Sequence, residues 1–300
     1  MQTLEVGKRI ALSNILFATD FSPYSDTALP YALALARKYG AKVYGSHVVS
    51  SEDYLFTAPD LWPKQMEEEK KLQKEVAGHV DEQLRGFAHE VLFGVGDVVS
   101  VLQKQIKEND IDLLVMGTHG RTGTRKLLMG SIAEKIFRQA ECPVLSVGPN
   151  VVPKVTGDIE FQHILLATDF GKESLAALPF TLSLASEGQA RLTLLHVEEV
   201  PIQGTVELDD LRASLKERLV DLIPPEAEEW CDVETLVQFR RTFVTPAEQI
   251  LEVAKERDAD LIVVGVRPLH GAIGPVTHMA HTTDQHIVAH ASCPVLTVRG

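Results

Sequence analysis

The sequence repeats itself once, and this repeat limits the folds open to the chain more than any other feature. The matching segments lie 148 to 151 residues apart; they are 15–49 with 164–198, 110–117 with 258–265, and 142–147 with 293–298. A period near 150 residues is too long for a solenoid repeat and suits a whole domain. Pro and Gly interrupt every pattern near 148–158, so we predict two domains of the same fold, at 1–150 and 151–300.

Short apolar segments alternate with segments of helical spacing in each copy. In the first copy the expected strands are 14–20, 41–49, 89–94, 111–117 and 143–147, and the expected helices are 25–40, 64–85, 97–110 and 131–141. We expect Gly40 to end the first helix and Asp97 to cap the third. The alternation predicts a parallel sheet covered on both faces, and right-handed crossovers make each copy a doubly wound α/β domain.

Composition excludes several other classes of protein. An apolar fraction of 45% and a charged fraction of 24% are typical of folded globular chains. No apolar run approaches the ~18 residues of a membrane span, and the first residues lack the pattern of a secretory signal. Three cysteines do not build a disulfide framework, so we expect a cytoplasmic protein with reduced thiols.

The net charge of −13 argues against general binding of nucleic acid or of anionic lipid. The charge is unevenly distributed. Residues 1–150 hold 17 Lys and Arg against 19 Asp and Glu, whereas residues 151–300 hold 12 against 23. The first copy is therefore the better candidate for binding an anion.

The segment 117–131, GTHGRTGTRKLLMGS, combines four glycines, three cations and four hydroxyl residues with no carboxylate. It runs from the carboxyl end of the fourth expected strand into the last helix, where ligands bind in open parallel sheets. Gly117 and Gly120 permit backbone conformations that other residues avoid and let an anion come close. We expect Ser131, after Gly130, to cap the helix, whose first turn offers free N–H groups to a phosphate. The cations at its mouth are Arg121, Arg125 and Lys126.

On these residues alone, the alternative is a mobile glycine-rich surface loop with solvated cations. Two common phosphate motifs are excluded, because the spacing is not GxxxxGK[ST] and no strand-borne GxGxxG precedes a helix. Both interpretations of the segment stay open at this point.

Together with the rest of the chain, the segment resembles the nucleotide-binding universal stress proteins, whose pattern is G-x2-G-x9-G-[ST]. Gly117, Gly120, Gly130 and Ser131 match it position for position. The resemblance extends to ILFATDFS, HVV and CPVLSV at three of the strands, and spans the chain as a tandem of two such domains. It implies a Rossmann-like fold of the adenine nucleotide alpha hydrolase type, with five parallel strands in each copy, that binds ATP with or without Mg²⁺.

The resemblance also implies roles for residues of the first copy. Asp20 would contact the nucleoside, the backbone at Val48 would meet the adenine, and the loop glycines and hydroxyl would hold ribose and phosphates. The expected binding residues are Asp20, Val48, Met116, Gly117, Gly120, Arg121, Gly130, Ser131 and Ile132. The alternative for Asp20 is a helix cap or a loop hydrogen bond. For His47 we favour a buried histidine satisfied by its neighbours over a ligand.

The second copy does not repeat the glycine pattern. In residues 265–285 Gly265 remains, but Pro268 replaces the second glycine and removes an N–H donor. Arg267 is the one cation in this segment, although Asp169 still closes the first strand of the copy. We therefore expect one competent nucleotide site per chain and a degenerate second domain.

The segment is also three residues longer than its counterpart. Counting back from Cys293 places His281 and Thr282 at the positions of Gly130 and Ser131.

Histidines and cysteines give weaker signals. Residues 270–290 are rich in histidine; the members are His270, His278, His281, His286 and His290. The pair at 286 and 290 has helical spacing for a metal site, but we favour solvated or capping histidines and expect no metal. Cys142 and Cys293 are expected to be small buried apolar residues, and Cys231 is a candidate for an exposed thiol.

Catalysis would require a positioned base, a metal-binding carboxylate or a dedicated phosphate lysine, and none is evident beside 117–131. His119 alone is weak evidence for one. We expect a nucleotide-responsive binding module in the stress response, in which ATP orders residues 118–130 and changes the surface that a protein partner meets. The alternatives are an interaction scaffold, in which the CPVL segments pair as a pseudo-dimer and further homodimerisation is open, and a weak ATPase.

Overall fold

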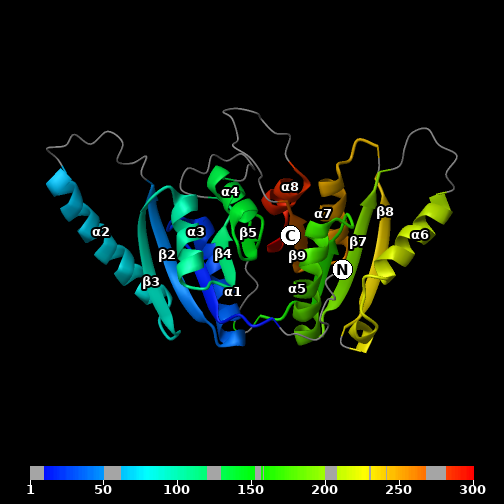
Figure 1. The fold of residues 1–300 in the computed structure, drawn as a ribbon, viewed down its shortest axis with the longest axis horizontal. Coiled ribbons are helices and arrows are strands. Elements are labelled where there is room, and N and C mark those ends of the chain that lie inside the picture. Colours follow the sequence, from blue (N-terminus) through cyan, green and yellow to red (C-terminus); the bar gives the residue numbers. More distant parts are fainter. Residues whose placement is uncertain are drawn as a thin grey trace. The chain divides into compact units, whose positions relative to one another are not determined.

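The computed structural model describes residues 10–50, 62–119, 130–152, 157, 159–199, 208–229, 231–240, 242–267 and 282–300. The chain forms two compact units (Figure 1). The N-terminal unit is built on Ala11–Val147 and the C-terminal unit on Glu160–Gly300, and Ile10 and Gly148–Val152 group with the latter.

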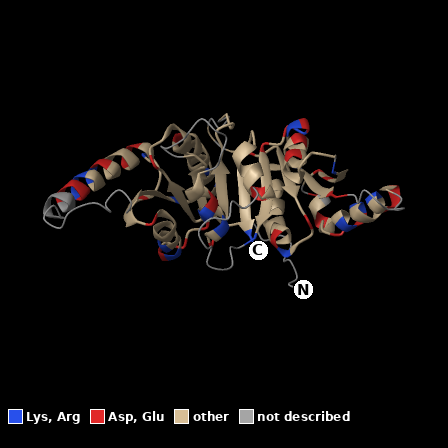
Figure 2. Ribbon diagram, turned by 90° about the horizontal axis from the view of Figure 1, so that it is seen from above, with Lys and Arg blue, Asp and Glu red and all other residues tan. Residues whose placement is uncertain are grey.

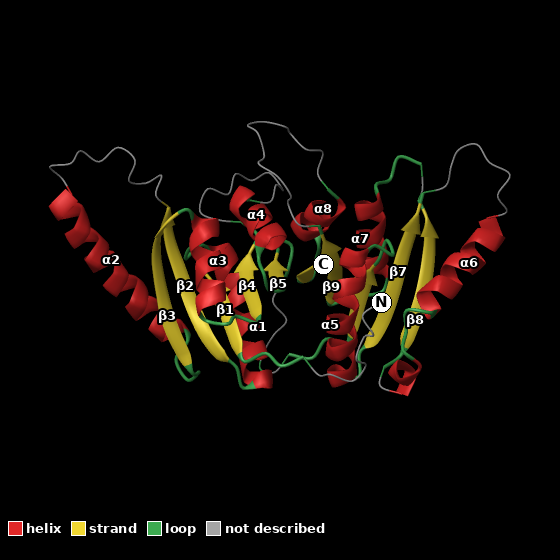
Figure 3. Ribbon diagram, in the orientation of Figure 1, coloured by secondary structure: helices red, strands yellow, loops and turns green. Residues whose placement is uncertain are grey.

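The N-terminal unit is a doubly wound α/β domain, as the alternating pattern predicts. Its elements are β1 (Asn14–Ala18), α1 (Pro23–Tyr39), β2 (Lys42–Ser50), α2 (Trp62–Gln83), β3 (His89–Gly96), α3 (Val98–Glu108), β4 (Leu113–Gly117), α4 (Ser131–Gln139) and β5 (Val144–Val147). The strands lie in the order β3-β2-β1-β4-β5, and every neighbouring pair is parallel. Helices cover both faces of the sheet (Figure 3). The expected five-stranded parallel sheet is confirmed.

Local signals in the sequence set the ends of the helices. Ser22 caps α1 by accepting a hydrogen bond from the Ser25 N–H at 3.2 Å. α1 ends at Gly40, whose φ of 65° lies in the left-handed region that glycine tolerates best. Asp97 caps α3 by accepting from the Ser100 N–H at 2.9 Å. The expectations for Gly40 and Asp97 are confirmed.

The core of this unit is centred on β1 and β4. Ile15, Leu16 and Phe17 of β1 are fully buried, and so are Leu114 and Val115 of β4. Because successive side chains of a strand point to opposite faces, this continuous burial means that both faces are covered. Each such side chain contributes about 1.5–3 kcal/mol, so the carboxyl ends of these strands stand on a rigid base.

The C-terminal unit repeats the architecture. Its elements are β6 (His163–Ala167), α5 (Lys172–Gly188), β7 (Arg191–Glu198), α6 (Leu208–Val220), a 3₁₀ turn (Pro225–Glu229), β8 (Val233–Phe239), α7 (Pro246–Glu256), β9 (Leu261–Val266), α8 (Thr283–His290) and β10 (Val295–Arg299). The strand order β8-β7-β6-β9-β10 is again parallel throughout. α7 begins with a capping box between Thr245 and Glu248.

Most charged residues lie on the helices and connections, and the strands carry few, such as Lys42 of β2 and Glu90 of β3 (Figure 2). α2 shows this most clearly, since Lys, Glu and Asp follow one another along it while Val76 and Val80 are buried. Over the described ranges, every helix is too short or too polar to cross a bilayer.

Candidate functional site

The carboxyl ends of β1 and β4 form the candidate site of the N-terminal unit. These two strands are neighbours, with Ala18 opposite Met116, and the chain winds away from them in opposite directions. Ligands of open α/β sheets bind at such a switch point. The structure brings three segments with predicted binding residues to this edge: Asp20 after β1, Met116 and Gly117 at the end of β4, and Gly130 to Ile132 at the start of α4. Gly120 and Arg121 lie outside the described residues.

The β1–α1 turn is held by short-range hydrogen bonds from its own side chains. Thr19 Oγ1 accepts from the Phe21 N–H at 3.0 Å, and Asp20 Oδ1 accepts from the Ser22 N–H at 3.0 Å. Phe21 adopts a φ of 58°, a left-handed conformation that is costly for a bulky residue. Its ring packs against His47 at 4.7 Å between centroids. The turn therefore fixes where the Asp20 carboxylate stands.

The alternative expected for Asp20 was a helix cap or a loop hydrogen bond, and the structure shows the second of these. Asp20 makes a loop hydrogen bond, while the cap of α1 is Ser22. The assignment of Asp20 to a nucleoside stays a prediction.

His47 behaves as a buried, satisfied histidine. Its Nδ1 donates to the Thr19 carbonyl at 2.8 Å, and the side chain is 5% exposed. Val48 follows on β2, past the last β1–β2 pair, in which Ala18 faces Ser46. β2 continues to Ser50 alongside β3, so Val48 lies beyond the end of β1, near the edge that carries Asp20.

Gly117 is glycine because of packing. A Cβ atom added there would lie 2.7 Å from the Tyr24 carbonyl oxygen and 3.1 Å from the Ser25 nitrogen, both in the first turn of α1. Its φ is outside the left-handed region, so the expectation that Gly117 provides an unusual backbone conformation is wrong. Gly265 makes the same contact in the C-terminal unit, where a Cβ would lie 2.2 Å from the Glu173 carbonyl.

Gly130, not Ser131, is the N-cap of α4, which corrects the sequence prediction. Gly130 has a φ of −63° and a ψ of 138°, and it offers no side chain to cap the helix. Ser131 is the first helical residue. The Gly130 N–H donates to the Thr118 carbonyl at 3.1 Å, which ties the start of α4 to the end of β4. The first-turn N–H groups of α4 thus lack a side-chain cap from Gly130, as a phosphate site requires.

His119 lies next to this junction. Its Nδ1 is 2.9 Å from Thr118 Oγ1, and its ring packs 5.4 Å from that of Tyr24. The ring contact connects the residues that follow β4 to the start of α1.

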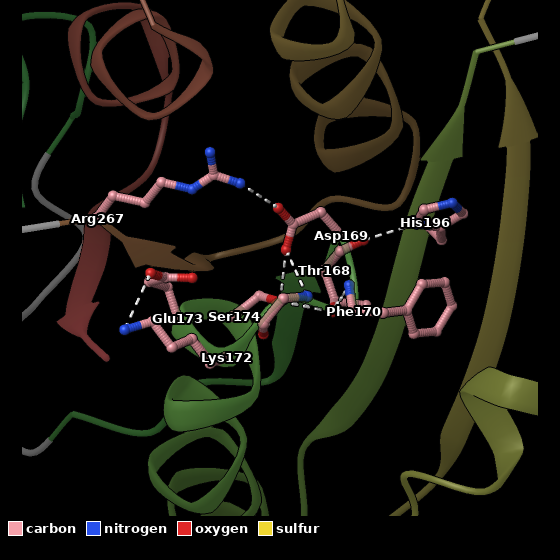
Figure 4. A network of polar contacts seen from close by, with 9 residues as sticks. Thr168, Asp169, Phe170, Lys172, Glu173, Ser174, His196 and Arg267 are labelled. Atoms are coloured by element: carbon pink, nitrogen blue, oxygen red, sulfur yellow. Dashed lines mark hydrogen bonds and ion pairs between the residues drawn. The ribbon is translucent and has the colours of Figure 1, made fainter.

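In the C-terminal unit, the carboxylate equivalent to that of Asp20 belongs to Asp169, and it contacts three residues of the same unit (Figure 4). Asp169 Oδ1 accepts from the Gly171 N–H and from Ser174 Oγ, each at 2.9 Å, and its Oδ2 lies 3.5 Å from the Arg267 guanidinium. Partial burial raises the pKa of Asp169, but the two hydrogen bonds and the charge of Arg267 outweigh it and hold this pKa below its ordinary value. Phe170 repeats the left-handed turn with a φ of 61°.

The start of α8 also differs from that of α4. Thr282 is the N-cap and forms a capping box with Gln285, whose Oε1 accepts from the Thr282 N–H at 3.3 Å. When the two copies are aligned by their helix caps, Thr282 corresponds to Gly130. This corrects the alignment of His281 with Gly130, which came from counting back from Cys293. The count fails because α8 is one residue shorter than α4. His281, Pro268, His270 and His278 lie outside the described residues.

Comparison with known proteins settles the family. A model of the universal stress protein family matches residues 12–148 and, separately, residues 160–299. The chain belongs to the universal stress protein family. It is a tandem of two such domains, as its internal repeat predicts.

Individual family members resemble each copy or the whole. Universal stress protein MJ0531 of Methanocaldococcus jannaschii is 33% identical over 140 residues, which are 44% of this chain and 80% of the relative. Universal stress protein MJ0577 of the same organism is 26% identical over 155 residues, 46% and 96% of the two chains. A solved universal stress protein from Archaeoglobus fulgidus covers 95% of this chain and 98% of its own, with a TM-score of 0.69 and 23% identity. This last similarity concerns the fold.

The structure shows the surroundings of the cysteines and of the histidine pair. Cys142 and Cys293 are buried as expected, but Cys231 is also buried, at 7% exposed, so its expected exposure is wrong. Burial raises the pKa of Cys142 to about 12. His286 and His290 stack with their ring centroids 4.1 Å apart, and His290 Nδ1 donates to the His286 carbonyl. No cluster of three metal-ligating side chains occurs among the residues placed by the structure.

Two features of the site were missed at the sequence level. The reason for Gly117 is a contact with α1, which spacing along the chain does not reveal. The capping box of α8 is visible as the T-x-x-Q pattern at 282–285 and could have been found.

Proposed function

We propose that the N-terminal unit, within residues 1–150, binds an adenine nucleotide, with ATP as the expected ligand, and that the degenerate unit within 151–300 does not. The observation that carries this proposal is the start of α4, where Gly130 provides no side-chain cap and is tied to the end of β4 at a switch point of the sheet. Three supports converge there: the glycine pattern, the positive end of the α4 helix dipole and the Asp20 carboxylate. The chain then acts as a nucleotide-responsive binding module, whose surface at the β4–α4 connection differs between its free and bound states.

The residues present fit the nucleotide chemically. The first-turn N–H groups of α4 would face the phosphates, together with the Ser131 hydroxyl, and Asp20 would accept hydrogen bonds from ribose hydroxyls. Val48 would present its backbone to the base. A nucleotide bound in this way is held and oriented.

Native mass spectrometry of freshly purified protein, followed by calorimetry with ATP, tests the proposal. We expect one nucleotide per chain, and the same spectra report how many chains associate. Titrations with and without Mg²⁺ test whether the metal accompanies the nucleotide. Two equivalent sites, or none, would refute the assignment, and an absence of binding would leave the interaction scaffold as the function.

Paired substitutions separate the ligand role of Asp20 from its role in the turn. Asp20→Asn keeps an oxygen that can accept from the Ser22 N–H but removes the charge. Because a hydrogen bond to a charged group is worth about 1.5–3 kcal/mol, we expect ATP affinity to fall roughly ten-fold to a hundred-fold. Asp169→Asn, the matched control in the C-terminal unit, should leave ATP affinity unchanged.

A further inference from the structure

We infer that the C-terminal unit is closed to nucleotide by its own side chains, which occupy the two positions where the N-terminal unit would hold one. This inference rests on the proposed function, because it takes the Asp20 carboxylate and the start of α4 as the anchor points. The side chains that stand in for the ligand are Arg267, Thr282 and Gln285.

The first anchor point is the carboxylate after the first strand of each copy. In the C-terminal unit, Arg267 extends from the end of β9 toward Asp169, and the two side chains form an ion pair at 3.5 Å (Figure 4). The corresponding residue of the N-terminal unit, two residues after Gly117, is His119, which differs from Arg267 in side chain and whose Nδ1 lies 2.9 Å from Thr118 Oγ1. Arg267 thus places a cation on the carboxylate that a ribose would otherwise approach.

This ion pair alone is a weak barrier. Arg267 and Asp169 side chains are 75% and 60% exposed, and exposed pairs are screened by solvent and salt. A tightly held ligand could displace Arg267 from the carboxylate, so closure requires a second element.

The second anchor point is the start of the last helix. In α8 the Thr282 and Gln285 side chains form a capping box. The Gln285 Oε1 accepts a hydrogen bond from the Thr282 N–H at 3.3 Å. Asp284 adds a carboxylate in the same turn and accepts from the Gln285 N–H at 3.0 Å. An anion at this position would have to displace the cap and would meet the negative charge of Asp284.

The N-terminal unit has small residues at both capping positions. Gly130 replaces Thr282, and Ala133, the third helical residue of α4, stands where Gln285 stands in α8. The acidic residue in the first turn of α4 is Glu134, whose Oε1 lies 3.8 Å from Nε of Arg138, one turn later in the helix. The two helices therefore differ at the positions that decide whether a ligand or a side chain caps them.

Amide hydrogen exchange measured unit by unit tests the inference. In nucleotide-free wild-type protein, we expect the first-turn amides of α8 to exchange about five-fold to ten-fold more slowly than those of α4. ATP should then protect α4 and leave α8 unchanged. Equal exchange at the two helix starts without nucleotide would overturn the inference. A lack of protection of α4 by ATP would instead refute the proposed function, so the two failures are distinguishable.

A variant that copies the N-terminal residues into the C-terminal unit provides the stronger test. In Arg267→His, Thr282→Gly and Gln285→Ala combined, we expect the α8 amides to lose their protection and calorimetry to detect a second ATP site per chain. A variant that folds, as judged by unchanged exchange of the buried β9 amides, and still binds a single ATP would overturn the inference.

The reverse substitution keeps the test independent of that variant's folding. Gly130→Thr introduces the capping side chain of α8 at the start of α4, where, among the described residues, the added Cβ meets the Thr118 carbonyl oxygen at 3.4 Å. We expect the α4 amides to become protected without nucleotide and ATP affinity to fall at least ten-fold. Unchanged affinity, with the new cap formed, would also overturn the inference.

Discussion

Replacing Gly117 by Ala should destabilise the N-terminal unit through a clash with α1. The new Cβ would lie 2.7 Å from the Tyr24 carbonyl oxygen and 2.9 Å from its carbon. Reaching an ordinary contact of 3.4 Å requires the start of α1 to move by roughly 0.7 Å. The helix start cannot retreat freely, because the Ser22 cap and the Thr19–Ser25 contact at 3.1 Å hold it to the end of β1.

The expected loss of stability follows from these contacts. Overpacking costs typically about 1–3 kcal/mol, and we expect the upper part of that range because the obstructing atoms belong to backbone. For a unit of this size, a loss of about 2–3 kcal/mol lowers Tm by roughly 5–10 °C. Gly265→Ala should cost more in the C-terminal unit, since its Cβ would approach Glu173 backbone atoms to 2.2 Å.

Urea unfolding with hydrogen exchange assigns the loss to one unit. In Gly117→Ala, we expect faster exchange of the β1 and β4 amides and unchanged exchange of the β9 amides. Gly78→Ala in α2 is the control, because no atom of the residues that the structure describes lies within 4 Å of its added Cβ and removing a helix glycine should stabilise by about 0.5–1 kcal/mol. If Gly117→Ala unfolds at the wild-type urea concentration yet binds ATP poorly, the glycine serves the ligand and the packing argument is wrong.

Three further predictions concern cysteine reactivity, a helix cap and a helix end. With its pKa raised from 9.0 to about 12, Cys142 should carry roughly a thousand-fold less thiolate than a free thiol, so a disulfide reagent should label it in the native protein only as fast as the unit opens. Asp97→Ala should cost about 1 kcal/mol near neutral pH. Hydrogen bonds from Ser100 lower the pKa of Asp97 below 3.8, so this cost should vanish as the pH falls through that lowered value; a cost that persists in acid would show that the carboxylate is not the cap. Gly40→Ala should lower the unfolding free energy by about 1–2 kcal/mol because its φ of 65° is strained for any other residue, and an unchanged urea midpoint would contradict that reasoning.

The fold was predictable from the sequence because its signals are local and occur twice. Short continuous apolar runs form the buried strands, and caps such as Asp97 and stops such as Gly40 lie where turn chemistry places them. The internal repeat provided a second, independent instance of each strand and helix. Such signals do not depend on how distant segments pack.

The details of the site were less predictable because they depend on contacts across the fold. Spacing identified Gly117 and Gly130 as one motif, yet one of them accommodates α1 and the other is a helix cap. Ser131 was assigned to the cap because its side chain suits that position, but the helix begins at Ser131 itself, one residue earlier than this assignment requires. The pairing of His281 with Gly130 failed because a count along the sequence assumes helices of equal length.

The phenylalanine with a left-handed backbone conformation, in the turn after the first strand of each copy, can be interpreted because the chain contains that turn twice. Phe21 and Phe170 hold nearly the same φ, 58° and 61°, although the glycine pattern survives in one copy alone. A conformation retained merely to serve a ligand would have been free to relax in the copy that lost the pattern. We infer that the strained turn after β1 and β6 was present before the two halves diverged and that it serves the construction of the sheet. The connection after the fourth strand of each copy changed in sequence, whereas this turn kept its conformation.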